Sequence, residues 1–331
     1  MMDDFRSLQK IDAHIHYNST RPILQKLGHE YGFRYVTINT EVPFFPSIDE
    51  QREIAIEAGK ATPSNLDWIG TFGTSGWQDP EWMDRAGEQI TTALAAGACA
   101  IKIWKNIGMT LRDETGRFIM VDDPRFDPLL ALLESRGVPL IGHLGEPRNC
   151  WLPLDMMTVR SDREYFSQHP EYHMHLHPEY PSHDAQIRAR NEMLDKHPKL
   201  RFIGAHLASL EWSVHEVAKW LDRFPNAAVD LAERINHLQL QSVTDHAGVV
   251  RFIEAYQDRI IYGTDIIDDE SLDEQQLIKE LTGRWVDHWK FFATDEWLQS
   301  HEFDQPFRGL NLDQSILNKI YMDNARVWYD I

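Results

Sequence analysis

Residues 10–16, Lys-Ile-Asp-Ala-His-Ile-His, are the stretch from which the rest of the chain is interpreted. Three apolar residues alternate with polar ones, and alternation with a period of two predicts a β-strand. Side chains two apart on a strand point to the same face, so His14 and His16 project together. Two adjacent imidazoles can bind one divalent metal ion, at about 2.0–2.1 Å for each Zn–N bond. An ordinary strand with polar residues on its solvent face has the same pattern, so the motif needs support from elsewhere.

The length and charge of the chain limit the classes of protein to which it can belong. Its 331 residues, 42% of them hydrophobic, suffice for one large domain or two small ones. A formal net charge of -19 disfavours nucleic-acid or anionic-membrane partners, which need clusters of Lys and Arg. A small-molecule substrate fits this composition, and a homo-oligomer remains open. The two cysteines, Cys99 and Cys150, suggest neither a disulfide framework nor a thiolate metal site.

The N-terminal stretch from Met1 to Lys10 is polar and leads directly into the first strand. It leaves no room for a signal peptide, and no later apolar run reaches membrane-spanning length. We therefore expect a soluble, cytoplasmic protein.

Eight predicted strands alternate with helices along the chain. The strands are residues 10–16, 33–39, 66–72, 99–104, 138–143, 200–206, 227–231 and 259–265. Nearly all are continuously apolar, which predicts a parallel sheet buried on both faces. Eight such units in about this length predict an α/β fold of the (β/α)8 TIM-barrel type. No Gly-rich phosphate loop follows the first strand, which argues against an open doubly wound sheet. We expect a single domain over residues 1–331.

The helices carry their own start and stop signals. Ser47 is a candidate N-cap for a helix over residues 47–60, which Gly59 and Pro63 would end. Residues 213–216, Ser-Val-His-Glu, predict a capping box. Another helix is expected over residues 243–256, directly before the eighth strand.

One connection is much longer than the others. Residues 144–183 follow the fifth strand and are rich in Pro, His, Tyr and Trp. A connection of this length inside a barrel is usually functional, and we expect it to lie over the barrel mouth as a lid. Its histidines could imitate a metal cluster, but their irregular spacing favours a solvated or substrate-facing loop. They are His169, His173, His175 and His177.

Ligand-type residues recur at the carboxyl ends of the predicted strands, where (β/α)8 barrels carry their reactive groups. They are His14 and His16 on the first strand, Lys102 with Trp104 on the fourth, His143 on the fifth, His206 on the sixth and Asp265 on the eighth. A single histidine of this kind is more often an ordinary core or loop residue. Five histidine or aspartate residues, all at strand ends, would require repeated coincidence, so the set favours a metal site.

Several motifs, in order along nearly the whole chain, resemble the amidohydrolase superfamily. They are IDAHIH, AIKIW, PLIGHLGEP, LRFIGAHLAS, IIYGTDI and the closing helix ILNKIYMDNARVWY. The likeness is specifically to the amidohydrolase-2 branch, which resembles aminocarboxymuconate-semialdehyde decarboxylase. The resemblance implies a distorted (β/α)8 barrel that holds one divalent metal ion, usually zinc.

The resemblance also implies roles for single residues. His14, His16, His143 and Asp265 match the metal ligands of the branch. His206 matches a sixth-strand histidine that acts on the water or substrate in mononuclear members and binds a second metal in binuclear ones. A metal in such a site lowers the pKa of bound water toward about 7. Asp265 would take the water's proton and return it to the leaving group, while His206 would polarise the scissile group.

Four further residues near these motifs need an interpretation. Lys102 could be carbamylated to bridge two metals, neutralise a substrate carboxylate, or form a salt bridge with a core acid. Trp104 is expected to line the substrate pocket or to pack in the core. Asp12 faces away from the two histidines on its strand and is interpreted as structural. Glu211 is interpreted as a residue that leads into the next helix.

The implied function is metal-dependent hydrolysis of a small carboxylate-bearing amide, lactone or ester by an activated water. The alternative is non-oxidative decarboxylation of a small acid, aromatic or unsaturated, on the same metal site. No arginine can be placed beside a substrate carboxylate from the sequence, which favours hydrolysis. A non-catalytic metal-binding sensor barrel is the hypothesis from another class, and the complete ligand set argues against it. We expect one Zn²⁺ ion, with a second only if Lys102 is carbamylated.

Overall fold

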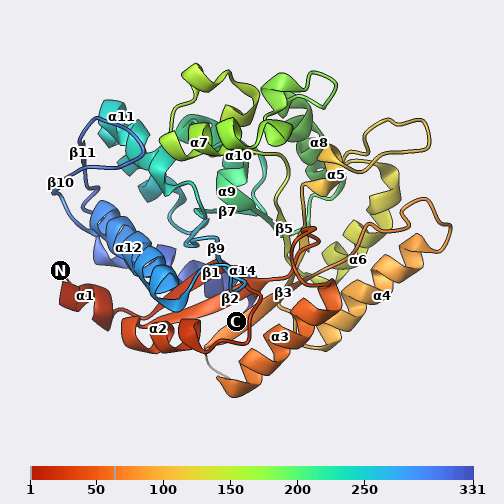
Figure 1. The fold of residues 1–331 in the computed structure, drawn as a ribbon, viewed down its shortest axis with the longest axis horizontal. Coiled ribbons are helices and arrows are strands. Elements are labelled where there is room, and N and C mark those ends of the chain that lie inside the picture. The colour runs from red at the N-terminus through yellow and green to blue at the C-terminus, as the bar shows by residue number, and fades with distance from the viewer. Residues whose placement is uncertain (1, 63–64) are drawn as a thin grey trace.

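Parallel strands with helices between them form the centre of the computed structural model, which describes residues 2–62 and 65–331 (Figure 1). The main sheet has the order β8-β7-β6-β5-β4-β3-β2-β1-β9, and its neighbouring strands are parallel. Strands that follow one another in the chain are therefore neighbours in space, with helices packed outside them. This order confirms the predicted (β/α)8 barrel. Pro63, one of the predicted helix-ending residues, lies outside the described part of the chain.

The first eight strands occupy the predicted places, and all of them except β1 are shorter than predicted. The strands of the main sheet are β1 (Lys10–Tyr17), β2 (Phe33–Ile38), β3 (Leu66–Thr71), β4 (Ala100–Ile103), β5 (Leu140–Gly142), β6 (Phe202–Gly204), β7 (Ala227–Asp230), β8 (Ile260–Ile261) and β9 (Ile266–Asp268). A separate antiparallel pair consists of β10 (Trp297–Leu298) and β11 (Phe307–Arg308).

Helices connect the strands and extend the chain beyond them. The α-helices are α1 (Met2–Ser7), α2 (Ile23–Tyr31), α3 (Ile48–Ala61), α4 (Trp82–Ala95), α5 (Asn106–Met109), α6 (Asp127–Arg136), α7 (Arg160–Gln168), α8 (His183–Lys196), α9 (Ala205–Ala208), α10 (Val214–Arg223), α11 (Ile235–Tyr256), α12 (Glu274–Ala293), α13 (Gln314–Asn318) and α14 (Asn324–Tyr329). Short 3-10 turns are η1 (Pro124–Phe126), η2 (Arg148–Trp151), η3 (Leu154–Met156), η4 (Pro170–Tyr172) and η5 (Met174–Leu176), and the π-helical turn η6 (Lys319–Asp323) joins α13 to α14.

The eighth strand is interrupted, and the interruption closes the barrel. β8 pairs with β7, whereas β9 pairs with β1 at the other end of the sheet. Between them, Ala13 N donates to Tyr262 O at 3.0 Å and Asp265 N donates to His14 O at 2.7 Å. The prediction of one continuous strand over residues 259–265 was therefore wrong, because the chain crosses here from β7 to β1.

Small and branched side chains fill the inside of the barrel. They come from alternate strand positions, because successive strand residues point to opposite faces. They are Ile11, Ala13, Val36, Ile38, Ile69, Ala100, Ile141, Ile203, Ala228 and Ile261. Ala325 and Tyr329 of α14 pack against the same cluster, and Trp328 donates to the carbonyl of Asp258, just before β8. The C-terminal helix thus covers the amino end of the barrel and leaves the carboxyl end for polar residues.

Two helix boundaries differ from the predictions. α11 begins at Ile235, eight residues before the predicted start at 243, and its backbone is non-helical at Asp245 (φ -140°, ψ 64°). The Ser213 hydroxyl accepts a bond from Glu216 N, as predicted, but the reciprocal half of the capping box is not formed. Ser47 forms a complete capping box with Glu50 at the start of α3.

The long connection over residues 144–183 is built of short helical segments. Its α7 lies at the top of Figure 1, on the side where β5 ends. A small apolar cluster supports it, consisting of Met109, Cys150, Met157, Phe166 and Met174. Its role as a lid stays a prediction. Within the ranges that the structure describes, no helix has both the length and the apolar composition needed to cross a membrane.

Candidate metal centre

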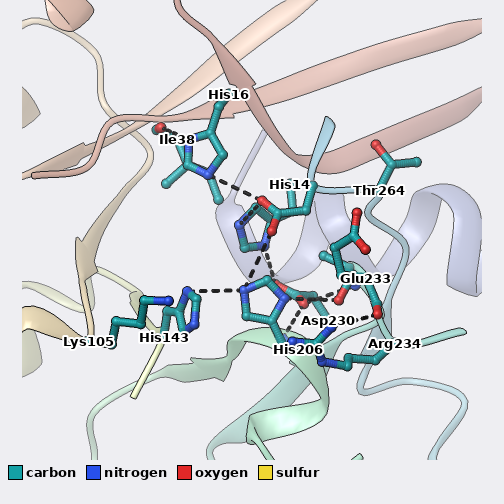
Figure 2. A network of polar contacts seen from close by, with 12 residues as sticks. His14, His16, Ile38, Lys105, His143, His206, Asp230, Glu233, Arg234 and Thr264 are labelled. Atoms are coloured by element: carbon teal, nitrogen blue, oxygen red, sulfur yellow. Dashed lines mark hydrogen bonds and ion pairs between the residues drawn. The ribbon is translucent and has the colours of Figure 1, made fainter. Parts of the chain in front are cut away.

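Side chains from both ends of the chain meet at the carboxyl end of the barrel (Figure 2). His14 and His16 project from β1, and their Nε2 atoms both lie 3.2 Å from Oδ1 of Asp265. His206 follows β6, and its Nε2 atom lies 3.9 Å from Oδ2 of Asp265 and 3.2 Å from Nδ1 of His143. The structure therefore brings together all five residues that the sequence analysis selected as ligands or catalytic groups.

The rings of His14 and His16 are oriented by bonds on the side away from Asp265. His16 Nδ1 lies 2.8 Å from the carbonyl oxygen of Ile38, which can only accept, so Nδ1 carries the proton. His14 Nδ1 lies 2.7 Å from a carboxylate oxygen of Asp230, which accepts in the same way. In the neutral imidazole only one nitrogen is protonated, so Nε2 of each ring presents a lone pair to Asp265.

The ring of His206 is oriented in the same way, by a hydrogen bond from its Nδ1 atom. Its Nδ1 atom lies 2.9 Å from the carbonyl oxygen of Ala232, which leaves Nε2 unprotonated in the neutral ring. Burial lowers the pKa of His206 to about 3 and the pKa of His143 well below its usual range, so both rings are neutral at pH 7. Three ring lone pairs thus converge on one carboxylate.

Asp265 remains ionised in this setting. Burial alone would raise the pKa of its carboxyl group, but the positive charge that His14, His16 and His206 carry when protonated lowers that pKa well below its usual range. Its Oδ1 atom is buried and has no hydrogen-bond donor, although two ring nitrogens lie 3.2 Å away. When the two rings are neutral, each has its proton on Nδ1 and none on Nε2 to donate to Oδ1.

This donor set fits a divalent cation. Unprotonated imidazole nitrogens and a carboxylate are the nitrogen and oxygen ligands that Zn²⁺ takes in proteins. Ligand atoms of His14, His206 and Asp265 lie within 4.8 Å of one another, and this is the only group of its kind among the described residues. Lone pairs that face a carboxylate repel it unless a positive charge lies between them. The buried, donor-free Oδ1 of Asp265 is therefore the observation that most directly indicates a metal.

His143 reaches this group through His206 rather than through Asp265. It follows β5, and its ring centroid lies 4.3 Å from the ring centroid of His206. Figure 2 shows Lys105 beside it. The Lys105 ammonium forms an ion pair with Glu146 of the long connection, and that pair links β4 to the segment after β5.

Lys102 and Trp104, the predicted substrate-binding residues, occupy different positions. Lys102 is buried, and its Nζ atom lies 3.4 Å from Nε2 of His14, directly at the centre. Burial lowers the pKa of this lysine to about 8. Trp104 follows β4, and its side chain is half-buried. The ammonium group of Lys105 lies 5.8 Å from the centroid of its indole ring. Because β4 ends at Ile103, Trp104 lies one residue beyond the strand and not at its last position as predicted.

Asp230 is the functional residue that the sequence analysis missed. It ends β7 and is fully buried. One carboxylate oxygen accepts from His14 Nδ1 at 2.7 Å, and the other accepts from the backbone N–H of His206 at 2.7 Å. Its position at the end of the seventh strand was the available signal, because strand ends in such barrels carry functional groups.

Asp12 is structural, as predicted, and it acts next to Asp265. Its buried carboxylate accepts from the N–H of Thr264 at 2.9 Å and from the Thr264 hydroxyl at 2.7 Å. Asp265 follows at once with φ 62°, a left-handed backbone conformation. Asp12 thereby fixes the turn from which Asp265 reaches the two β1 histidines.

The backbone after β6 is unusual. Four consecutive residues, His206, Leu207, Ala208 and Ser209, have φ between 52° and 58°. The left-handed conformation costs roughly 1–2 kcal/mol for each residue with a Cβ. Strain of this size persists only where the surroundings enforce it. The turn follows directly from Gly204, where an added Cβ would lie 2.4 Å from the Cβ of Ala208.

Other polar and aromatic residues surround the centre. The ring of Phe45, in the loop after β2, lies 5.1 Å from the ring of His16. Arg234 follows β7, and its positive charge contributes to the low pKa of His206. Glu211 is buried and accepts from Arg148 N at 2.7 Å, so the prediction that it merely leads into a helix was incomplete.

The histidines of the long connection lie apart from the centre. His173 is buried and bonds to the carbonyl of Leu152 at 2.8 Å, so the solvated alternative of the predicted solvated or substrate-facing loop does not hold for this residue. His169 and His177 are at least partly exposed and each lies near a glutamate. These histidines form no metal-type cluster in the described part of the chain.

A polar cleft of about 1190 Å³ lies next to the centre, between α7, α12 and the β10–β11 pair. Thr264 and Glu233 belong to its wall, and Arg284 of α12 forms an ion pair with Glu233 there. The candidate ligands are not among its lining residues. The cleft is therefore a neighbouring feature and not the place where the ligands converge.

The sequence matches a family model described as amidohydrolase, of the amidohydrolase-2 type, over residues 65–331. The chain belongs to the amidohydrolase family. It is therefore an enzyme of the amidohydrolase type, in a metal-dependent family that acts on small molecules. The match begins after β1 and β2, so it does not include His14 and His16. A comparison with curated proteins finds no match.

Solved structures with the same fold include two enzymes and one uncharacterized protein. A 2,6-dihydroxybenzoate decarboxylase from Rhizobium is 15% identical, with 98% of this chain and 99% of that chain covered and a TM-score of 0.55. A 4-oxalomesaconate hydratase from Rhodopseudomonas palustris is 12% identical, with 97% and 96% covered and a TM-score of 0.52. An uncharacterized TIM-barrel protein from Bordetella bronchiseptica is 15% identical, with 98% and 100% covered and a TM-score of 0.53. At these identities the comparison shows that the amidohydrolase shares a fold with them. It does not show which reaction the amidohydrolase catalyses.

Proposed function

We propose that this amidohydrolase hydrolyses a small carboxylate-bearing amide, lactone or ester with the help of one Zn²⁺ ion. The observation that carries the proposal is the convergence of ring nitrogens on Asp265, because Nε2 of His14 and of His16 lie 3.2 Å from its donor-free Oδ1 and Nε2 of His206 lies 3.9 Å from its Oδ2. In this proposal His14, His16, His143 and Asp265 hold the metal. When bound, such an ion supplies a Lewis acid that polarises a carbonyl and makes water reactive at neutral pH.

The chain's own residues would manage the proton. Asp265 is ionised and its side chain is partly exposed, so its second oxygen, Oδ2, can accept a proton from the attacking water. The same carboxyl group would then give the proton to the leaving nitrogen or oxygen. His206 Nε2 lies 3.9 Å from Oδ2 and would orient the reacting group through its lone pair or, transiently protonated, its N–H.

Substrate recognition is assigned to groups around the ligands. Lys102 is buried, lies beside His14 and has no carboxylate within ion-pair distance among the described residues, so its charge is available to a substrate carboxylate. Phe45 would contact the apolar part of the substrate from the opposite side, beside His16. Trp104 stays a candidate for the outer part of the pocket.

The proposal is tested with a panel of N-acyl amino acids, lactones, small esters and aromatic acids, assayed with zinc-loaded protein. We expect release of the hydrolysis product from at least one carboxylate-bearing member, with no activity after chelation. Carbon dioxide release without any hydrolysis would replace the proposal by the second candidate below.

Non-oxidative decarboxylation is that second candidate, and Arg234 favours it. Its guanidinium lies near enough to His206 to lower the ring's pKa, and its buried Nε atom has no hydrogen-bond partner. An arginine beside the ring is the group that could hold a substrate carboxylate, and the sequence alone could not place one. The Rhizobium structure of the same fold is itself a decarboxylase.

A substitution of Arg234 separates the two candidates. Arg234→Gln should abolish carbon dioxide release from an aromatic acid if the arginine holds the departing carboxylate. It should change KM more than kcat if the enzyme is a hydrolase in which Lys102 binds the carboxylate.

A further inference from the structure

The left-handed turn at His206–Ser209 is held from outside the barrel by one helix. The carbonyl of Ala208 accepts from the guanidinium Nη1 of Arg190, on α8. His183, at the start of the same helix, bonds through Nε2 to the carbonyl of Ser209 at 3.0 Å. Two successive carbonyls of a strained turn are thus tied to α8, while its first N–H is tied to Asp230.

Arg190 is an uncommon residue for such a place. Its side chain is almost fully buried, with 1% of its surface exposed, and no ion pair among the described residues includes it. Its remaining contacts are with Asn191 Oδ1, at 3.2–3.3 Å, and with the face of Trp220, whose ring centroid lies 4.6 Å away. A buried charge without a counter-ion destabilises the folded protein. We therefore expect Arg190 to have a role that compensates for this destabilisation.

We infer that Arg190 is a positioning residue that holds the left-handed turn and so aims His206 Nε2 at Asp265. The inference rests on the proposed function only insofar as His206 takes part in the reaction. Three observations support it: the turn is strained over four residues, Arg190 bonds to its third residue, and the ring at its first residue faces the candidate metal centre. Without that bond the turn loses a constraint and should relax, because residues with a Cβ prefer other backbone conformations.

A merely structural arginine offers a matched control. Arg259, which precedes β8, donates to the backbone carbonyls of Ala227 and Phe224. It is partly buried and, like Arg190, bonds to carbonyls, but it lies at the amino end of the barrel, away from the ligands. Loss of Arg259 should therefore reduce stability without moving His206.

The experiment compares Arg190→Met, Arg190→Lys and Arg259→Met with the wild type. Hydrogen–deuterium exchange is measured on metal-free protein at the amides of Ser209 and Leu210, both bonded within the turn. We expect at least about tenfold faster exchange in Arg190→Met and wild-type exchange in Arg259→Met. Lysine retains one donor for the Ala208 carbonyl, so Arg190→Lys should restore most of the protection. Should Arg190→Met fail to fold, Arg190→Lys should still exchange faster than the wild type.

Turnover supplies the second measurement. In Arg190→Met, kcat should fall roughly 10–100-fold, the range seen when a partner that orients a metal-site residue is removed, with little change in KM. Arg259→Met should keep the wild-type kcat. Wild-type exchange in Arg190→Met, or an equal loss of kcat in Arg259→Met, would overturn the inference. The exchange measurement needs no substrate, so it decides the inference even if the proposed reaction is wrong.

Discussion

Asp230 contacts the centre only through two neighbours, the ring of His14 and the backbone N–H of His206. It therefore connects the first strand of the barrel to the left-handed turn after the sixth. Both of its oxygens accept, and an amide in its place could accept with only one of them. The position of two rings thus depends on a residue that need not touch the metal itself.

Replacing Asp230 by asparagine should weaken metal binding without unfolding the protein. We expect the dissociation constant for Zn²⁺ to rise roughly 10–100-fold, as for other partners that orient metal ligands. Competition with a chromophoric chelator measures it. Asp67→Asn is the control, because Asp67 is paired with Arg34 at the start of β3, away from the ligands. Equal zinc affinity in Asp230→Asn and the wild type would contradict the assignment.

Replacing ligand residues should remove the metal. His14→Ala and His143→Ala should each purify with little zinc and no activity, because each loses a ring nitrogen from the donor set. Metal analysis of the purified proteins measures the stoichiometry. The His143 variant is the more stringent test of the ligand set, because His143 approaches Asp265 only through His206. Full zinc occupancy in either variant would remove that residue from the ligand set.

Asp265→Asn separates proton transfer from folding. The amide retains the size of the side chain but cannot accept the water's proton, so kcat should fall by at least about 10²-fold, the low end for general acid–base catalysis. Circular dichroism should show a near-native fold. A wild-type kcat would show that Asp265 takes no part in the reaction.

The interrupted eighth strand shows what a sequence can and cannot predict at the level of elements. Apolar runs identified the strands, and strand ends identified the ligand residues, because a period of two and a buried parallel sheet leave clear patterns. The break before Asp265 and the turn at His206–Ser209 left no such pattern. Residues with a Cβ adopt left-handed conformations there only because tertiary contacts such as Asp12–Thr264 and Arg190–Ala208 enforce them. Asp230 was missed for the related reason that its partners are distant in sequence.

Gly263 lies in the interruption between β8 and β9 and packs against β1. An added Cβ would lie 2.7 Å from the Cβ of His14, closer than real contacts allow. Gly263→Ala should therefore lower the free energy of unfolding by about 1–3 kcal/mol and should also displace His14, so that zinc affinity falls. Urea unfolding of metal-free protein measures the first effect.

Gly283, within α12, supplies the control for that substitution. No heavy atom lies within 4 Å of its added Cβ, so Gly283→Ala should leave stability unchanged or raise it by up to about 1 kcal/mol. If Gly263→Ala were as stable as Gly283→Ala, the packing of the break against β1 would not be as described.

Across the whole molecule the proposed metal joins the first strand to the last. His14 and His16 precede almost all of the chain, and Asp265 follows most of it. Metal binding to the folded state alone adds stability according to occupancy, about 2.7 kcal/mol at a free-metal concentration 100 times the dissociation constant.

Removing the metal should therefore lower the thermal midpoint. We expect a fall of several degrees after treatment with a chelator and dialysis, because each kcal/mol shifts the midpoint by about 2–4 °C in large domains. Added Zn²⁺ should restore the original midpoint, whereas Mg²⁺, which prefers oxygen ligands, should restore less. Identical melting curves before and after chelation would contradict a stably bound ion.

The pairing of β1 with β9 also has a consequence for folding during synthesis, because the two strands are made at different times. A ribosome releases the two histidines of β1 first, then His143 and His206, and the carboxylate of Asp265 last of these groups. Until that residue emerges, the nascent barrel lacks both its last hydrogen-bonded edge and the anionic member of the donor set. A cation that requires all of these groups can be captured only late, by a chain whose other strands are already available to fold.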